Sequence, residues 1–153
     1  MPQSLNMVIL HMVFSTKDRR PFIDEDIRPR LHAYSAEILR AIEPPHSHAY
    51  RVGGVEDHVH IAATLPRTVT IAKLFETVKR ESSIWIKKQG ERYQDFRWQS
   101  GYGNFSVGPS QLGQLIGYID KQEDHHKAIT FQDEFRKLLA KYKIEYDEHY
   151  VWD

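Results

Sequence analysis

The chain has 153 residues, a hydrophobic content of 41% and a formal net charge of zero. This length fits one domain, and the neutral charge argues against a protein that coats nucleic acid without specificity. The sequence contains no cysteine, which excludes disulfides and thiolate metal sites. It shows no targeting segment and no apolar run of membrane-spanning length, so we expect a cytoplasmic protein without a membrane partner.

Hydrophobic periodicity and turn residues divide the chain into alternating elements. In chain order they are a strand over residues 5–14, a helix over 25–42, strands over 47–55 and 58–65, a helix over 71–88, a strand within 96–107, a helix that opens at 109–110 and a last helix over 133–143. This order predicts an α+β, ferredoxin-like (RRM-like) fold: a four-stranded antiparallel sheet with helices, plus additional C-terminal helices. In this topology the first and third strands are the central pair.

Individual residues mark where these elements end or bend. Asp24 and Thr70 are of the type that caps helix N-termini. Pro44-Pro45 and Gly90 stop the first two helices. Gly53-Gly54 predicts a bulge or bend near the end of the second strand.

The third strand carries two histidines. Alternate side chains of a strand share a face, so His58 and His60 point one way while Val59 and Ile61 point into the core. Paired imidazoles form half of a metal site, although two ordinary histidines on a polar strand face give the same pattern. This face looks away from the two crossover helices, so the third helix is the candidate to cover it.

The helix that opens at 109–110 supplies a second half of such a site. Tyr118 and Gln122 are four residues apart and share a face of a helix. A phenol is a poor nucleophile at neutral pH because its pKa is near 10, but a nearby divalent ion polarises a phosphate and stabilises the departing oxygen. Two imidazoles and the amide oxygen of Gln122 would leave open positions on such an ion, as a catalytic site requires.

The two motifs together resemble a known family. His58-Val59-His60, followed by Tyr118-Ile119-x-x-Gln122-x-x-His125-His126, is similar to the single-tyrosine HUH transposases, which include small insertion-sequence transposases and the tyrosine transposases associated with repetitive extragenic palindromes. Residues 14–20 and 98–106 resemble the family as well. The similarity spans residues 5–127 and predicts one HUH-type transposase domain over residues 1–153, with a C-terminal helix and tail from 128 to 153.

The resemblance implies a chemistry and its partners. Tyr118 is expected to be the nucleophile, and His58, His60 and Gln122 are expected to bind Mg²⁺ or Mn²⁺. The enzyme would cleave single-stranded DNA that carries hairpins, form a 5′-phosphotyrosine and a free 3′-hydroxyl, and rejoin strands without ATP. Members of the family work as dimers, so a homodimer is expected.

Two other functions fit the same residues. One is a catalytically weakened nucleic-acid-binding module of the same fold, whose histidines are residual. The other is a nickase like those of replication initiators and relaxases, although such proteins usually order the tyrosine and histidine motifs differently along the chain.

The remaining candidates are phosphate contacts, aromatic residues and further histidines. The predicted phosphate contacts are Lys17, Arg19, Arg20, Lys79 and Arg80, for which a surface turn and a solvated helix face are the alternatives. Trp98, Tyr102 and Phe105 could stack on unpaired bases or pack around a bend. His125 follows Gln122 by three residues and could reach the same metal or bind DNA, whereas His126 is expected to point elsewhere. We favour structural or DNA-facing roles for both, and a packed core or sheet-face position for His11.

Overall fold

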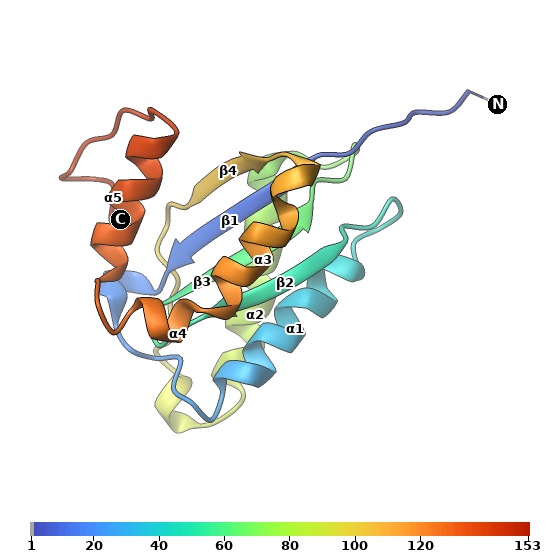
Figure 1. Ribbon diagram of the computed structural model, residues 1–153. Helices are drawn as coiled ribbons and strands as arrows, with labels where there is room; N and C mark the ends of the chain where they lie inside the picture. Colours follow the sequence, from blue (N-terminus) through green and yellow to red (C-terminus); the bar gives the residue numbers. More distant parts are fainter. Residues whose placement is uncertain (1) are drawn as a thin grey trace.

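The computed structural model describes residues 2–153. Its elements, in chain order, are β1 (Ile9–Ser15), η1 (Lys17–Arg19), α1 (Arg28–Arg40), β2 (Ala49–Gly54), β3 (His58–Thr64), α2 (Ile71–Lys87), η2 (Glu91–Tyr93), β4 (Gly103–Val107), η3 (Pro109–Gln111), α3 (Leu112–Asp120), α4 (Gln122–His125) and α5 (Phe131–Lys141). Figure 1 shows their arrangement. Within the described residues, no helix has both the length and the apolar character needed to cross a bilayer.

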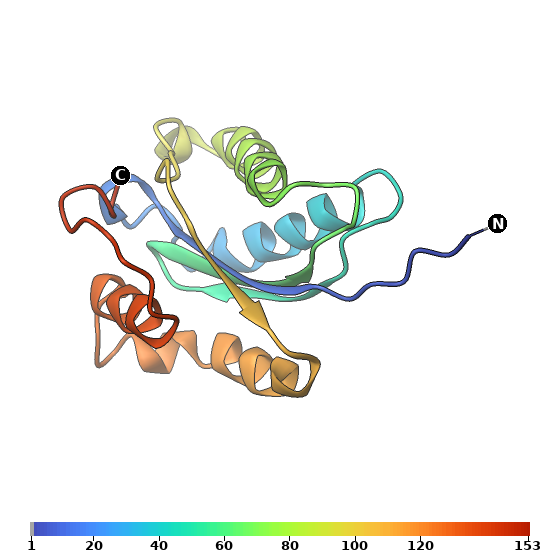
Figure 2. The same ribbon diagram turned by 90° about the horizontal axis from the view of Figure 1, so that it is seen from above.

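The four strands form one sheet in the order β2-β3-β1-β4, and every neighbouring pair is antiparallel. This confirms the ferredoxin-like prediction, with β1 and β3 as the central pair. Figure 2 shows helices on both faces of the sheet: α1 and α2 lie on one side, and α3, α4 and α5 on the other. The three C-terminal helices therefore cover the face that the first two leave open.

Strand alternation sorts the side chains of β1 and β3 between these two faces. Met12 and Phe14 of β1 and Ile61 of β3 are fully buried in the main hydrophobic core, against α1 and α2. The register pairs Val13 with His60 and Ser15 with His58. The histidines therefore face the C-terminal helices, as the two-residue period predicts.

Two smaller apolar clusters hold the C-terminal helices on this second face. Phe131 and Phe135 of α5 pack with Val13 of β1, while Leu115 and Ile119 of α3 pack on β3 through a second cluster. The two clusters lie on either side of His58 and His60. These polar side chains are therefore buried between two apolar contacts that hold the C-terminal helices on the sheet.

The structure corrects several predicted boundaries. β1 begins at Ile9, so it is shorter than the predicted strand over residues 5–14. Asp24 accepts hydrogen bonds from the backbone of Asp26 and Ile27, and thus caps a turn that precedes α1. The irregular pairing of β2 lies between Ala49 and Arg51, at the start of the strand, and not at the glycine pair.

The predicted third helix is interrupted. α3 ends at Asp120, Lys121 has non-helical dihedral angles, and the short helix α4 begins at Gln122. Tyr118 and Gln122 therefore lie on two consecutive helices. The chain still brings their side chains together, as described below.

Gly53 is required where α3 crosses β2. A Cβ atom at this position would lie 2.6 Å from Cγ2 and 3.0 Å from the carbonyl oxygen of Ile119, the residue that follows Tyr118. Because Ile119 is buried and β-branched, it cannot move away freely. The missing side chain therefore sets how closely the tyrosine-bearing helix approaches the sheet.

Gly53→Ala is accordingly expected to lower the free energy of unfolding by about 1–3 kcal/mol, the usual cost of overpacking. Urea denaturation measures this effect. Gly113→Ala is the matched control, because a Cβ atom at Gly113 in α3 meets nothing within 4 Å and alanine should stabilise the helix by up to about 1 kcal/mol. Equal stability of Gly53→Ala and wild type would contradict the close approach of α3.

Candidate metal and tyrosine site

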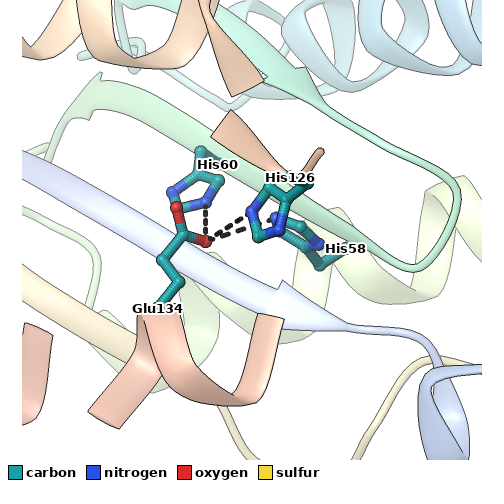
Figure 3. Close-up of side chains that lie close together, drawn as sticks. All are labelled: His58, His60, His126 and Glu134. Atoms are coloured by element: carbon teal, nitrogen blue, oxygen red, sulfur yellow. Dashed lines mark hydrogen bonds and ion pairs between the residues drawn. The ribbon is translucent and has the colours of Figure 1, made fainter. Parts of the chain in front are cut away.

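The histidines of β3 and a glutamate of α5 form the centre of the site. His58 and His60 are fully buried, and Glu134 is 2% exposed. Oε1 of Glu134 lies 2.9 Å from Nε2 of His60 and 3.4 Å from Nε2 of His58. His126 approaches the same oxygen with its Nε2 at 3.1 Å. Figure 3 shows the three rings directed at this carboxylate.

Each of these rings has a partner on its other nitrogen. Nδ1 of His58 lies 2.7 Å from the carboxylate of Asp57, and Nδ1 of His126 lies 2.8 Å from the carbonyl oxygen of Ile129. Nδ1 of His60 is 2.7 Å from Nε2 of His11, which is buried as expected. Such outer partners fix the orientation and the proton position of an imidazole that binds a metal.

The second carboxylate oxygen of Glu134, Oε2, is contacted by Tyr118 and Gln122, the two predicted site residues of the C-terminal half. The Tyr118 hydroxyl and the Gln122 amide both donate hydrogen bonds to Oε2. The amide oxygen of Gln122 lies 2.9 Å from Nε2 of His58. Nε2 of His125 also lies 3.3 Å from Oε2 of Glu134. One chain therefore brings the histidine pair, the glutamine and the tyrosine to a single carboxylate.

The histidines hold this carboxylate in its ionised form. Burial opposes a charge on Glu134, but the attraction of His60 and hydrogen bonds from two further histidines keep its pKa well below the usual range. Burial also opposes protonation of His58, yet its contacts with Asp57 and Glu134 raise the pKa of His58 to about 9. Burial lowers the pKa of His60 despite the same carboxylate. The network thus favours a positive charge on His58 and disfavours one on His60.

The same surroundings affect the tyrosine. Burial and the negative charge of Glu134 both raise the pKa of Tyr118. Its phenol nevertheless lines an open cavity of about 320 Å³ between α3 and α5, together with Glu134, Lys137 and Lys141. A phenolate would need a compensating cation here, and the cavity gives a ligand access to the hydroxyl.

The residues present fit a divalent metal ion. His58, His60, His126 and Glu134 each offer one ligand atom, and these atoms lie within 4.8 Å of one another. Neutral imidazoles suit transition ions such as Mn²⁺, whereas Mg²⁺ prefers oxygen ligands. The chemistry of the donor set therefore supports metal binding at this group.

The basic residues predicted to contact phosphate lie on other elements than the residues of this centre. They are Lys17, Arg19 and Arg20, at the end of β1, and Lys79 and Arg80 of α2. The Arg19 guanidinium lies over the Trp152 ring, at 5.7 Å. The Lys79 ammonium donates hydrogen bonds to the carbonyls of Gln99 and Gly101, and burial lowers its pKa to about 8. Lys79 therefore fastens the loop before β4.

Of the three aromatic residues that precede α3, Trp98 and Phe105 are packed in the protein, whereas Tyr102 is partly exposed. Phe105 is buried against α5, and Trp98 contacts the main core. Tyr102 is 39% exposed, and its ring stacks on Phe75 with a centroid distance of 3.7 Å. Packing around a bend therefore accounts for Phe105 and Trp98.

Glu134 and His126 are two residues of this centre that the sequence motifs did not predict. Glu134 follows Phe131 by three residues and precedes Leu138 by four, so it lies on the buried stripe of α5. An acid within an apolar stripe was the available signal. His126 was expected in a structural or DNA-facing role, but its ring faces the carboxylate because the chain turns between α4 and α5.

Comparison with known proteins places the chain in a family. The model of the family described as "Transposase IS200 like" matches residues 4–122. No curated protein matches significantly. A candidate transposase from Deinococcus radiodurans R1 has a similar structure, with a TM-score of 0.57 and 17% identity over 80% of this chain and 95% of that chain.

A REP-associated tyrosine transposase bound to a REP hairpin is also similar in structure, with a TM-score of 0.57 and 11% identity over 84% of this chain and 76% of that chain. At such low identity the two structures support the fold alone. The family match, however, covers most of the chain and includes His58, His60, Tyr118 and Gln122. The chain therefore belongs to the IS200-like transposase family.

Proposed function

We propose that the protein is a metal-dependent transposase that cleaves and rejoins single-stranded DNA through a 5′-phosphotyrosine intermediate. Family membership supports the general activity, and the similar structure bound to a REP hairpin supports hairpin DNA as the partner. The observation that carries the proposal is the meeting of Tyr118 with the His58–His60 pair at one buried carboxylate.

In the proposed reaction the Tyr118 oxygen attacks the phosphorus of a DNA phosphodiester. The bond to the 3′ oxygen breaks, the phosphate stays on Tyr118 as a 5′-phosphotyrosine, and the released oxygen becomes a hydroxyl. Oε2 of Glu134 already accepts the hydrogen bond of the Tyr118 hydroxyl and orients it, and the phenolic proton ends on the departing 3′ oxygen. A bound Mg²⁺ or Mn²⁺, held by His58, His60 and Gln122, would polarise the phosphate and stabilise the departing oxygen.

The cavity between α3 and α5 is the proposed entrance for the DNA strand. It reaches the Tyr118 hydroxyl, and Lys137 and Lys141 on α5 line it. Exposed ammonium groups beside the nucleophile suit a phosphate backbone. The proposed contacts farther along the DNA are Lys17, Arg19, Arg20, Lys79 and Arg80; for Lys79 the effect would pass through the loop that it holds.

We also propose that Tyr118 acts within its own chain. The tyrosine and the histidine pair meet in a single copy of the protein, so a homodimer, although proposed from the family, is not needed to complete the site.

The proposal is tested by incubating the wild-type protein with labelled single-stranded DNA that carries a hairpin and its flanking sequence, in the presence of Mn²⁺. We expect a covalent protein–DNA adduct on a denaturing gel and a released strand whose 3′-hydroxyl a polymerase can extend. Fully duplex DNA of the same sequence is the control and should give no adduct. Cleavage without a covalent adduct would contradict the proposal.

A further inference from the structure

Glu134 and His126 lie beyond residue 122, where the family match ends. We propose that these two side chains complete, with His58 and His60, a four-ligand metal centre. This inference rests on the proposed function and deepens it, because it makes the C-terminal helix α5 part of the metal site.

The first observation is the convergence of three imidazoles on one oxygen atom. Nε2 of His60, His126 and His58 lie 2.9, 3.1 and 3.4 Å from Oε1 of Glu134. Zinc–nitrogen bonds are about 2.0–2.1 Å long, so a small shift of the Glu134 carboxylate away from the rings would leave room for an ion of this kind between all four donors. The required movement is small because the rings already point at the same place (Figure 3).

The second observation is the position of the ring hydrogens. A carboxylate or a carbonyl oxygen only accepts, so Asp57 and the carbonyl of Ile129 fix a hydrogen on Nδ1 of His58 and His126. Nε2 is therefore the ring atom directed at the carboxylate, and it can offer its lone pair to a metal ion once it carries no hydrogen. The outer partners thus leave the ligand nitrogen of both rings on the side of Glu134.

The third observation concerns the other oxygen of the same carboxylate. Oε2 of Glu134 accepts hydrogen bonds from the Tyr118 hydroxyl and the Gln122 amide. If Oε1 binds the ion, the nucleophile stands at the edge of the metal centre. The Gln122 oxygen, 2.9 Å from Nε2 of His58, remains within reach as an additional ligand.

The ligand set also indicates the class of metal. Three imidazoles and one carboxylate suit Mn²⁺, Co²⁺ and Zn²⁺, whereas Mg²⁺ is usually bound through carboxylates, phosphates and water. Replacing either added ligand should weaken the binding of these transition ions.

Calorimetric titration of Mn²⁺ into the DNA-free protein tests the proposal. Glu134→Gln keeps the size of the side chain, and His126→Asn keeps a donor for the Ile129 carbonyl while removing Nε2. Each variant should weaken Mn²⁺ binding at least about tenfold, since even outer partners of metal ligands are worth that much. Asp133→Asn, on the exposed side of α5, and His149→Asn, in the exposed tail, are the matched controls and should bind like wild type.

A second measurement does not depend on the folding of any variant. X-ray absorption of the wild-type protein loaded with Co²⁺ counts the imidazoles around the ion. Three imidazoles support the proposal, and two overturn it. Unchanged or tighter Mn²⁺ binding by Glu134→Gln would also overturn it, because the carboxylate would then compete with the ion for the imidazole nitrogens.

These readouts are separate from DNA cleavage. If the affinities follow the proposal and no covalent adduct forms, the proposed function fails while the metal centre stands. If an adduct forms and the Co²⁺ ion has only two imidazole ligands, the four-ligand centre alone is wrong.

Discussion

Tyr118→Phe is expected to abolish adduct formation, with a loss of cleavage rate on the order of a thousandfold or more, as for removal of other catalytic nucleophiles. The substitution removes only the attacking oxygen and leaves the ring in its place against His11 and His60. The rate is measured by quantifying the labelled hairpin strand over time in Mn²⁺.

Tyr150→Phe is the matched control for this variant. Tyr150 lies in the C-terminal tail, is 64% exposed and does not line the cavity that contains Tyr118. We expect this variant to cleave like wild type. A Tyr118→Phe protein that still formed the adduct would show that another residue is the nucleophile.

The double replacement His58→Ala/His60→Ala is expected to weaken Mn²⁺ binding by at least about a hundredfold and to eliminate cleavage. The two rings supply two of the nitrogen atoms that face Glu134. Calorimetric titration with Mn²⁺ measures the affinity, and the adduct assay measures the activity. His46→Ala/His48→Ala, which alters two exposed histidines, is the control.

This double variant also carries a stability cost that must be measured. It leaves the buried Glu134 carboxylate with fewer partners, and breaking a buried ion pair typically costs about 3–5 kcal/mol. Urea denaturation separates unfolding from loss of the metal site. A folded double variant that binds Mn²⁺ as wild type does would contradict the assignment, and a wild-type protein without histidine-dependent affinity would favour the nucleic-acid-binding module.

The sequence predicts the parts of the site whose side chains are placed by the two-residue repeat of a β-strand. His58 and His60 face the C-terminal helices because side chains alternate along β3, and their register against β1 follows from the apolar residues between them. The strand order followed from the alternation of strands and helices. Thr70 caps α2 as predicted, with its hydroxyl accepting a bond from the Lys73 backbone.

The parts that depend on docking between distant elements could not be predicted. Glu134 meets His60 across 74 residues of sequence, and nothing local to either residue specifies the angle at which α5 packs on the sheet. The break at Lys121 contains neither proline nor glycine, so no turn residue marks it. Lys79 looked like an exposed cation because its partners are backbone carbonyls of a loop, which carry no sequence signal.

The proposed mechanism depends most on one contact, that between the Tyr118 hydroxyl and the Glu134 carboxylate. The most direct test is mass spectrometry of the proteolysed adduct formed with hairpin DNA and Mn²⁺. We expect nucleotides attached to the peptide that contains Tyr118, and none when His58 and His60 are both replaced. Attachment to any other residue, or an adduct that survives the loss of both histidines, would contradict it.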